Sequence, residues 1–457
     1  MKLYDKDRID WGTLLFDNKA LLWLLMPIVI EQLLNSLMGM VDTMMVTTVG
    51  STAISAVSLV DSINNLVIQL FSAMAAGAVI ICSQHIGRGN RKKSNEVAGQ
   101  IVLTVLVISL FITIFCLLGG KRLLHLIFGT VEYSVMENAF TYFLITILSY
   151  PFLGLFSAGA AFYRASGNSQ FPTKISIVSN LLNIIGNTLF IYGFKWGVAG
   201  AALSTFISRI FSTVVIYYCL RKPKQIIVVR DYRKIRPNLS IILSIMAIAV
   251  PAGIENSMFQ FGKIAIQSTI STLGTLAISA QAMTDIFELM NGIVSNGIGI
   301  GLMTVVGQAI GAHRIEEAKY YIVKLMKIAW IGVLTSCILV LLITTPVSWI
   351  SNMDPDAAKM CLQLVIAMTI VKPLVWVGAF GLPYGLKAAG DVRFSMIVSV
   401  CSMWICRVAL GMILVRVFHY GLMAVWIGIF IDWIIRAIIF TLRFLSGKWL
   451  PSNAQEI

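Results

Sequence analysis

The sequence predicts an all-α integral membrane protein. Its twelve transmembrane helices are expected to form two six-helix bundles related by a pseudo-two-fold axis along the membrane normal. Composition gives the first indication: of 457 residues, 58% are hydrophobic and 12% are charged, and the mean hydropathy is +0.86. Soluble domains typically carry about 25% charged residues. Two further observations, a series of long apolar runs and an internal repeat, give the number and the arrangement of the helices.

Twelve apolar runs are long enough to cross a membrane, because a hydrocarbon core of roughly 30 Å takes about 20 helical residues. The expected spans are 20–49, 53–86, 97–119, 137–163, 173–194, 198–220, 239–272, 275–311, 318–345, 357–386, 394–417 and 421–445. Runs of this length lack the alternating pattern of a β-barrel, and a helix satisfies its own backbone hydrogen bonds. The first run is too long for a signal peptide and is expected to remain as a helix.

The net charge of +14 gathers in alternate connections between the spans. The basic groups are Lys2, Lys6, Arg8 and Lys19 before the first span, Arg88, Arg91, Lys92 and Lys93 after the second, and seven Lys or Arg from Arg221 to Arg236 after the sixth. Basic loops stay in the cytoplasm, so both termini of this multi-pass protein are expected on the cytoplasmic side of the cell membrane. The charge therefore indicates orientation and not nucleic-acid binding.

The two halves of the chain repeat each other at an offset of 224 residues. "MPIVIEQ" at 26–32 aligns with "VPAGIEN" at 250–256, and 14 of the 62 positions from 26 to 87 are identical. Farther on, "YRASGNSQF" (163–171) resembles "LKAAGDVRF" (386–394) at an offset of 223. Chance similarity between apolar helices mostly aligns Leu with Ile, whereas these matches include Pro, Glu, Asp, Gln and several Gly. The pattern indicates a duplication of a six-helix unit.

Six helices separate equivalent positions, so both halves cross the membrane in the same sense. The expected organisation is a cytoplasmic segment (1–19), an N-lobe (20–220), a basic cytoplasmic linker (221–238), a C-lobe (239–446) and a cytoplasmic tail (447–457). Two bundles that rock against each other can open a central cavity to either side, which is typical of a transporter, whereas a channel needs a continuous pore. One chain contains both lobes, so a monomer suffices.

Asp42 lies in the apolar stretch "NSLMGMVDTMMV" of the first span. An ionised carboxylate at mid-bilayer costs at least about 2.5 kcal/mol, so a functional role is the default interpretation. Glu31 lies eleven residues earlier, on the same helical face and about 16 Å away along the axis. Asp42 could bind a proton, or oxygen neighbours could complete a site for Na⁺; no other metal site is expected.

A polar stripe on the fifth span could provide those neighbours. Asn180, Asn183 and Asn187 follow each other at spacings of three and four residues, which places them on one helical face. They are expected to line a cavity around Asp42, although a structural hydrogen-bonded seam between helices would give the same pattern. Thr205 in the sixth span is a further candidate, since a membrane threonine either binds a ligand or bonds its own backbone.

The second half differs in its chemistry. Glu255 repeats Glu31, but Ile266 stands where the first half has Asp42, and Lys263 replaces a glycine. Lys263 is expected to be a counter-ion for Glu255 or another carboxylate, with direct ligand or proton coupling as the alternative. Asp61 and Asp285 occupy matching positions and serve either in packing or in lining the substrate path.

Other intramembrane charges have weaker assignments. Asp432 and Arg436 are four residues apart on one helix and are expected to form a structural pair. Lys372 precedes a proline, and Arg407 has no predicted role. The seven cysteines occur singly, and no GxxxxGK[ST], HExxH or GxSxG motif is present. The chain is therefore not expected to be an enzyme, to hydrolyse ATP or to need a cofactor, and an ion gradient should supply the energy.

Several of these motifs resemble the multidrug and toxic compound extrusion (MATE) family along nearly the whole chain. They are "MGMVDTMMV", "SQHIGRGN", "GQAIGA", "LKAAGDVRF", "LLNIIGNTLFIYG" and "WGVAGAALST". The resemblance implies twelve helices in two lobes and cation-coupled antiport of organic cations and amphiphilic drugs. By resemblance, Asp42 is the coupling aspartate, Asn183 and Thr205 are its polar partners, and Glu255 is the seventh-helix carboxylate.

The resemblance also bears on the coupling ion. Asn187 stands where several relatives have an aspartate, and the tenth span lacks the mid-span carboxylate of sodium-coupled relatives. Proton antiport is therefore favoured over sodium. One alternative function is a flippase or exporter of lipid-linked or polysaccharide precursors, which would favour a strongly cationic cavity. An intramembrane enzyme or receptor would need a catalytic constellation or a large soluble segment, which the sequence lacks.

Overall fold

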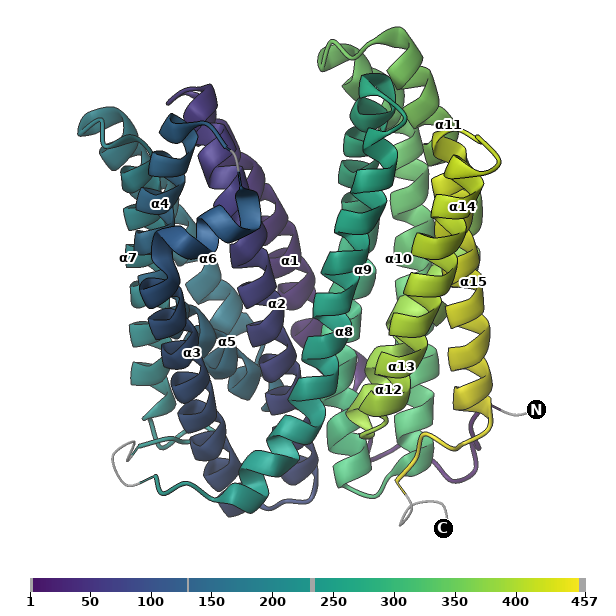
Figure 1. Ribbon diagram of the computed structural model, residues 1–457. Helices are drawn as coiled ribbons and strands as arrows, with labels where there is room; N and C mark the ends of the chain where they lie inside the picture. The colour runs from purple at the N-terminus through teal and green to yellow at the C-terminus, as the bar shows by residue number, and fades with distance from the viewer. Residues whose placement is uncertain (1–2, 130, 231–234, 452–457) are drawn as a thin grey trace. The chain divides into compact units, whose positions relative to one another are not determined.

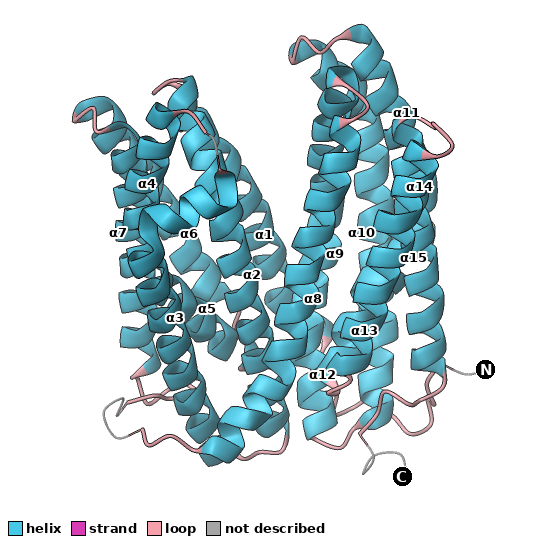
Figure 2. Ribbon diagram, viewed as in Figure 1, coloured by secondary structure: helices cyan, strands magenta, loops and turns pink. Residues whose placement is uncertain are grey.

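The computed structural model describes residues 3–129, 131–230 and 235–451, and every regular element in these ranges is a helix (Figures 1 and 2). The first half contains α1 (Asn18–Thr47), α2 (Ser51–Gly87), α3 (Arg91–Phe128), α4 (Tyr133–Leu148), α5 (Tyr150–Ala165), α6 (Gln170–Asn187), the short π-helix η1 (Thr188–Gly193) and α7 (Gly197–Leu220). Lys2, part of the predicted linker (231–234) and part of the predicted tail (452–457) lie outside the described residues.

The second half repeats this order with more interruptions. It contains α8 (Leu239–Ser271), α9 (Thr275–Gly311), α10 (Ile315–Ile350), α11 (Pro355–Trp376), η3 (Val377–Gly381), α12 (Leu382–Ala388), α13 (Val392–Ser402), η4 (Met403–Leu410), α14 (Gly411–Arg416) and α15 (Leu422–Leu445). The segments η3 and η4 are π-helical turns that continue the helices on either side of them. Short loops connect the long helices (Figure 2).

The described residues contain the expected number of membrane spans. Eleven helical runs are long and apolar enough to cross a membrane, and α4 with α5 makes the twelfth, as a pair bent by 44°. The bend has a local cause: Pro151 in the first turn of α5 has no N–H to donate to the carbonyl of Ile147. Thr113 Oγ1 donates to that carbonyl instead, at 3.4 Å. The prediction of an all-helical, twelve-span membrane protein is confirmed.

The helices pack into two compact units. Residues 18–253 form the N-terminal unit, and residues 1–17 with 254–457 form the C-terminal unit. In the N-terminal unit, α2 packs against α4 and α5, and α6 packs against α1 and α7. In the C-terminal unit, α9 packs against α10 and α11, and α15 packs against η3 and η4. The division differs from the predicted N-lobe and C-lobe, because it lies inside the unbroken helix α8 and not in the linker.

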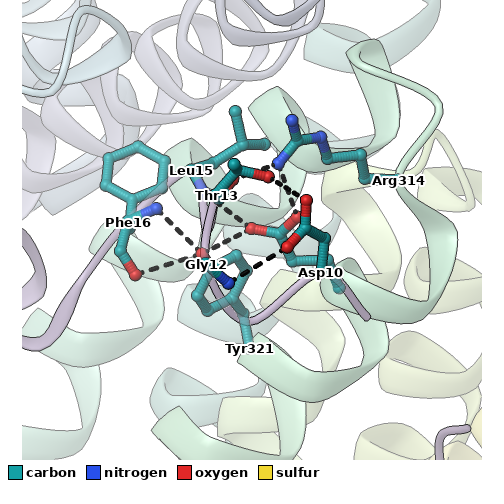
Figure 3. A network of polar contacts seen from close by, with 8 residues as sticks. Asp10, Gly12, Thr13, Leu15, Phe16, Arg314 and Tyr321 are labelled. Carbon is teal, nitrogen blue, oxygen red and sulfur yellow. Dashed lines mark hydrogen bonds and ion pairs between the residues drawn. The ribbon is translucent and has the colours of Figure 1, made fainter. Parts of the chain in front are cut away.

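The segment before α1 packs on the first two turns of α10, which the sequence did not predict (Figure 3). Glu317 Oε1 accepts hydrogen bonds from Leu15 N and from the Tyr321 hydroxyl, both at 2.7 Å. The Tyr321 hydroxyl in turn accepts a hydrogen bond from Phe16 N at 2.8 Å. Glu317 is 4% exposed. The side chains of α10 thus replace the water that the backbone of this irregular segment would otherwise bind.

Arg314 and Asp10 complete this contact. Arg314 donates to the Thr13 carbonyl at 2.5 Å, and Asp10 accepts from Thr13 Oγ1 at 2.6 Å and from Gly12 N at 3.0 Å (Figure 3). The hydrogen bonds from Thr13 and Gly12 lower the pKa of Asp10 below its ordinary value. The ionised Asp10 carboxylate therefore stabilises the turn from Asp10 to Thr13 at neutral pH. This stabilisation is lost as the pH falls through the lowered pKa of Asp10.

Replacing Glu317 with alanine should release this segment while leaving the helices folded. We expect amide hydrogen exchange at Leu15 and Phe16 to accelerate about tenfold or more, because Leu15 N loses its acceptor and the Tyr321 hydroxyl loses its anchor. Exchange measured by mass spectrometry on peptides covering residues 3–17 tests this. The exposed Glu132→Ala variant is the control, and equal exchange in both variants would contradict the assignment.

Candidate functional site

Asp42 of α1 is bonded to the C-terminal end of α6. Asn187, the last residue of α6, donates from Nδ2 to Asp42 Oδ1 at 2.7 Å, and the same nitrogen lies 3.3 Å from Asn183 Oδ1. Asn183 and Asn187 are buried and Asp42 is half-buried. The four-residue spacing of the two asparagines places both amides toward α1, because residues i and i+4 share one helical face.

Asn183 extends this network to α7. Its Nδ2 lies 3.2 Å from Thr205 Oγ1, and its main-chain carbonyl accepts from Ser204 Oγ at 2.7 Å. In the opposite orientation of its amide, Asn183 would donate to Asp42 Oδ1 at 2.8 Å and accept from Thr205. The four residues predicted for ion coupling therefore lie together in the N-terminal unit. Asn180, the third member of the stripe, is outside the network, because its Nδ2 has no hydrogen-bond partner among the described residues.

Asp61 belongs to a second network in the same unit. Asn64 Nδ2 donates to Asp61 Oδ1 at 3.1 Å, and the buried Tyr150 hydroxyl donates to Asn64 Oδ1 at 2.8 Å. Arg209 of α7 donates to Ser149 Oγ at 2.6 Å and interacts electrostatically with both Asp61 and Asp42. The sequence analysis missed Arg209, although a single arginine inside an apolar span is itself a signal of function. Arg209 therefore places a positive charge in electrostatic contact with the carboxylates of both networks.

The repeated glutamates form equivalent ion pairs in the two units. Glu31 of α1 pairs with Arg164 of α5, and Glu255 of α8 pairs with Lys387 of α12, each at 2.7 Å. These residues occupy matching positions in the two repeats. The counter-ion of Glu255 is thus Lys387 and not Lys263. The other predicted option, that Lys263 serves another carboxylate, stays a prediction, and Lys263 interacts electrostatically with Asp285. The position of Lys263 on α8 does not predict its partner. The partner of Glu255 depends on which neighbouring helix faces this glutamate, and that helix is α12.

Hydroxyl groups add to the first of these pairs. Thr173 and Ser176 of α6 approach the Glu31 carboxylate at 3.4 and 3.3 Å. The Glu31 side chain is only 5% exposed, so most of its hydrogen-bonding capacity is used within the protein. Glu31 therefore links α1 to both α5 and α6.

The C-terminal unit contains charged residues around a separate cavity. The cavity has a volume of about 230 Å³ and is lined by Gln260, Lys263, Ile264, Ile266, Gln267, Ile270, Gln281, Asp285, Glu288, Arg407, Trp426 and Ile429. Asp285 accepts from Gln281 Nε2 at 2.8 Å, and Gln281 Oε1 accepts from Trp426 Nε1 at 2.8 Å. Asp285 thus lines a cavity. Lining was one of the two roles that the sequence suggested for it, the other being packing. The apolar residue Ile266, at the position equivalent to Asp42, lines the same cavity.

Two arginines share one carboxylate beside this cavity. The predicted pair of Asp432 and Arg436 is confirmed at 2.7 Å, and Arg407 also approaches Asp432 at 3.0 Å. Lys372 is fully buried; it donates to the Glu288 main-chain carbonyl at 3.0 Å and lies 4.1 Å from the centre of the Trp376 ring. Lys372 and Arg407 therefore have defined structural partners.

A family model for MatE matches the chain twice, over residues 27–189 and 251–413. The chain belongs to the MatE family. The two matches begin 224 residues apart, which is the offset of the internal repeat. Each half of this MatE protein therefore corresponds to one copy of the family unit, in agreement with the duplication inferred from the sequence.

Full-length relatives and solved structures support the membership. A Thermotoga maritima protein named probable multidrug resistance protein NorM is 25% identical over 442 residues, 94% of this chain and 93% of the relative. The Bacillus subtilis uncharacterized transporter YisQ is 25% identical over 444 residues, 96% of each chain. A solved multidrug resistance MATE family transporter, in an outward-facing conformation, aligns with a TM-score of 0.89 at 20% identity over 96% of this chain and 97% of that chain. The structural likeness establishes the MATE fold.

Breaking the ion pair of Glu31 should destabilise this MatE protein. In Arg164→Ala the Glu31 carboxylate stays buried without its partner, which costs about 3–5 kcal/mol of unfolding free energy. Thermal and denaturant unfolding of the purified protein in detergent measure the change. The double variant Glu31→Gln/Arg164→Gln should recover much of the loss, because it leaves no unpaired charge. The exposed Arg416→Ala variant is the control, and a similar stability for Arg164→Ala and this control would refute the energetic role of the pair.

Proposed function

We propose that this chain is a secondary antiporter that exports organic cations or amphiphilic drugs by alternating access. The gradient of a coupling cation drives it, with the proton favoured over sodium. Membership of the MatE family, and relatives that carry multidrug resistance names, support the export of drugs. The Asp42 network supplies the candidate coupling site.

One observation carries the coupling proposal: the Asp42 network contains a buried hydrogen-bond acceptor that has no donor in the part of the chain that the structure describes. The carbonyl oxygen of the Asn187 side chain, Oδ1, is buried beside Asp42 without a hydrogen-bond donor among the described residues. No Lys or Arg nitrogen of the described residues lies within ion-pair distance of Asp42. A half-buried carboxylate and a buried orphan acceptor together favour binding of a proton or a small cation, because either would satisfy both.

The composition of the network favours the proton over sodium. Protonation of Asp42 supplies one O–H donor, which suits one orphan acceptor. A sodium ion needs several oxygen ligands, and a second carboxylate would strengthen such a cage. Asp42 is the network's one carboxylate, since the adjacent position of α6 is Asn187. Occupancy of Asp42 would change the α1–α6 contact and so shift the balance between conformations.

The basic residues of the C-terminal unit give less support to the flippase alternative. A site for a strongly anionic lipid-linked precursor would need several available cations. Lys372 is fully buried and stacked on Trp376, and Arg407 is paired with Asp432. Lys263 is exposed and remains available.

We further propose that the protein works as a monomer in the cell membrane with both termini in the cytoplasm.

Neutralising Asp42 should abolish coupled transport. We expect sealed vesicles with the purified protein to move a fluorescent organic cation under an imposed pH gradient, and Asp42→Asn to lose this movement, because an amide cannot bind and release the proton. The exposed Asp356→Asn variant should retain it. Transport driven by a sodium gradient alone would assign Asp42 to sodium. Failure of the parent protein under both gradients would refute the drug-export proposal.

Asn187 provides a second test of the network. In Asn187→Leu the Asp42 carboxylate loses its 2.7 Å donor and the orphan acceptor disappears. We expect at least about a tenfold loss of the gradient-driven rate with the protein still folded, because a similar side-chain volume remains. Asn180→Leu is the matched control, because Asn180 lies on the same face of α6 and has no hydrogen bond to Asp42. Equal losses in the two variants would show that the Asp42 contact is not specific to transport.

A further inference from the structure

The cavity of the C-terminal unit contains charges of both signs. Lys263 and Arg407 lie on its wall together with Asp285 and Glu288. A site for a simple organic cation would gain from the two carboxylates and lose from the two cations. The mixture of positive and negative side chains therefore indicates a ligand that carries both charges.

The cationic side is incompletely paired. The Lys263 ammonium lies 5.3 Å from the centre of the Phe259 ring, and no carboxylate of the described residues lies within ion-pair distance of it. The Arg407 guanidinium lies 5.3 Å from the centre of the same ring. Both positive groups thus contact Phe259 beside the cavity.

Arg407 is already paired with a carboxylate. It is 4% exposed, and its Nη2 forms an ion pair with Asp432 Oδ2 at 3.0 Å. Asp432 also serves Arg436, so one carboxylate faces two guanidinium groups. This cluster retains a net positive charge beside the cavity. That excess positive charge favours an anionic group in the cavity over a second cation.

The anionic side lies on α9. Asp285 and Glu288 are three residues apart, which places them on neighbouring positions of one helical face. The chain from Trp426 through Gln281 fixes one oxygen of Asp285, and no Lys or Arg of the described residues pairs with Asp285 within ion-pair distance. Asp285 does interact electrostatically with Lys263 and Arg407 at longer range. The acids and the cations therefore face a common space without neutralising each other directly.

We propose that this cavity binds the zwitterionic end of an amphiphilic substrate. A carboxylate of the substrate meets Lys263, near the net positive cluster of Arg407, Asp432 and Arg436, and its protonated amine meets Asp285 and Glu288. The volume of about 230 Å³ suits a charged end group of amino-acid type, whereas a cavity for a whole drug is typically about 300–1,000 Å³. This inference rests on the proposed export function and narrows its substrate class. The unpaired Lys263 would disfavour a ligand that lacks the carboxylate.

Three related probes separate the two charges of the ligand. Nε-dansyl-lysine has a zwitterionic end and a fluorescent apolar tail. Its methyl ester keeps the amine and lacks the carboxylate, and its Nα-acetyl derivative keeps the carboxylate and lacks the charged amine. Fluorescence titration of the full-length protein in detergent gives the affinity of each. We expect the zwitterion to bind about tenfold or more tightly than either derivative.

Two variants assign the charges to residues. Lys263→Gln should weaken binding of the zwitterion about tenfold and leave the methyl ester within about twofold, because the lost partner serves the carboxylate. Asp285→Asn should weaken the zwitterion and the methyl ester and leave the acetyl derivative unchanged. Lys121→Gln is the matched control, since Lys121 lies 5.0 Å from the Phe140 ring in the other unit. Arg407 is left intact because it also pairs with Asp432.

The outcomes separate this inference from the proposed function. If the methyl ester binds as well as the zwitterion, or if Lys263→Gln changes neither, the zwitterion site is refuted, while gradient-driven export of a simple cation would still stand. If the zwitterion is preferred and the variants respond as expected, but no gradient moves any probe in vesicles, the binding site is supported and the export function fails. Thermal unfolding confirms that each variant is folded before it is titrated.

Discussion

The ion pair of Glu31 with Arg164 is the interaction on which the N-terminal unit's candidate site depends. It joins α1 to α5 inside the protein at 2.7 Å, and hydroxyl groups of α6 approach the same carboxylate. Asp42 lies three helical turns farther along α1, so the rotation of α1 that Glu31 fixes also directs Asp42 toward α6. A rotation of α1 by one residue would turn Asp42 through about 100° and break its contact with Asn187.

The C-terminal unit contains an equivalent ion pair, with a lysine in place of the arginine. Glu255 pairs with Lys387 as Glu31 pairs with Arg164, and the pairs occupy equivalent places in the repeat. Duplication has preserved this interaction while the neighbouring chemistry diverged. Where the first half has a carboxylate bonded to asparagines, the second has Ile266 and a cavity with charges of both signs. One half thus keeps a candidate site for a small cation, and the other keeps a site suited to an organic ligand.

The N-terminal segment is a further constraint of this fold. Residues 1–17 group with the C-terminal unit, although the chain continues directly into α1 of the N-terminal unit. The chain therefore passes between the two units at two places, once before α1 and once within α8. The contacts of Glu317 and Tyr321 with this segment are hydrogen bonds to the backbone, so they depend little on which side chains the segment carries.

The sequence by itself determined the membrane class, the twelve spans, the duplication and the shared helical face of Asn183 and Asn187. These follow from local properties: hydropathy over about 20 residues, a fixed repeat offset and the spacing of side chains on one helix. The partnership of Asp42 with Asn183 and Thr205 was implied by the family resemblance, and the packing of three helices brings these residues together. Only the tertiary structure decided that Glu255 pairs with Lys387, that Arg209 approaches Asp42 and Asp61, and that residues 3–17 bind α10. Partners on different helices depend on how each helix is rotated and bent, as at Pro151. That information lies in the packing of the whole unit and not in the spacing along one segment.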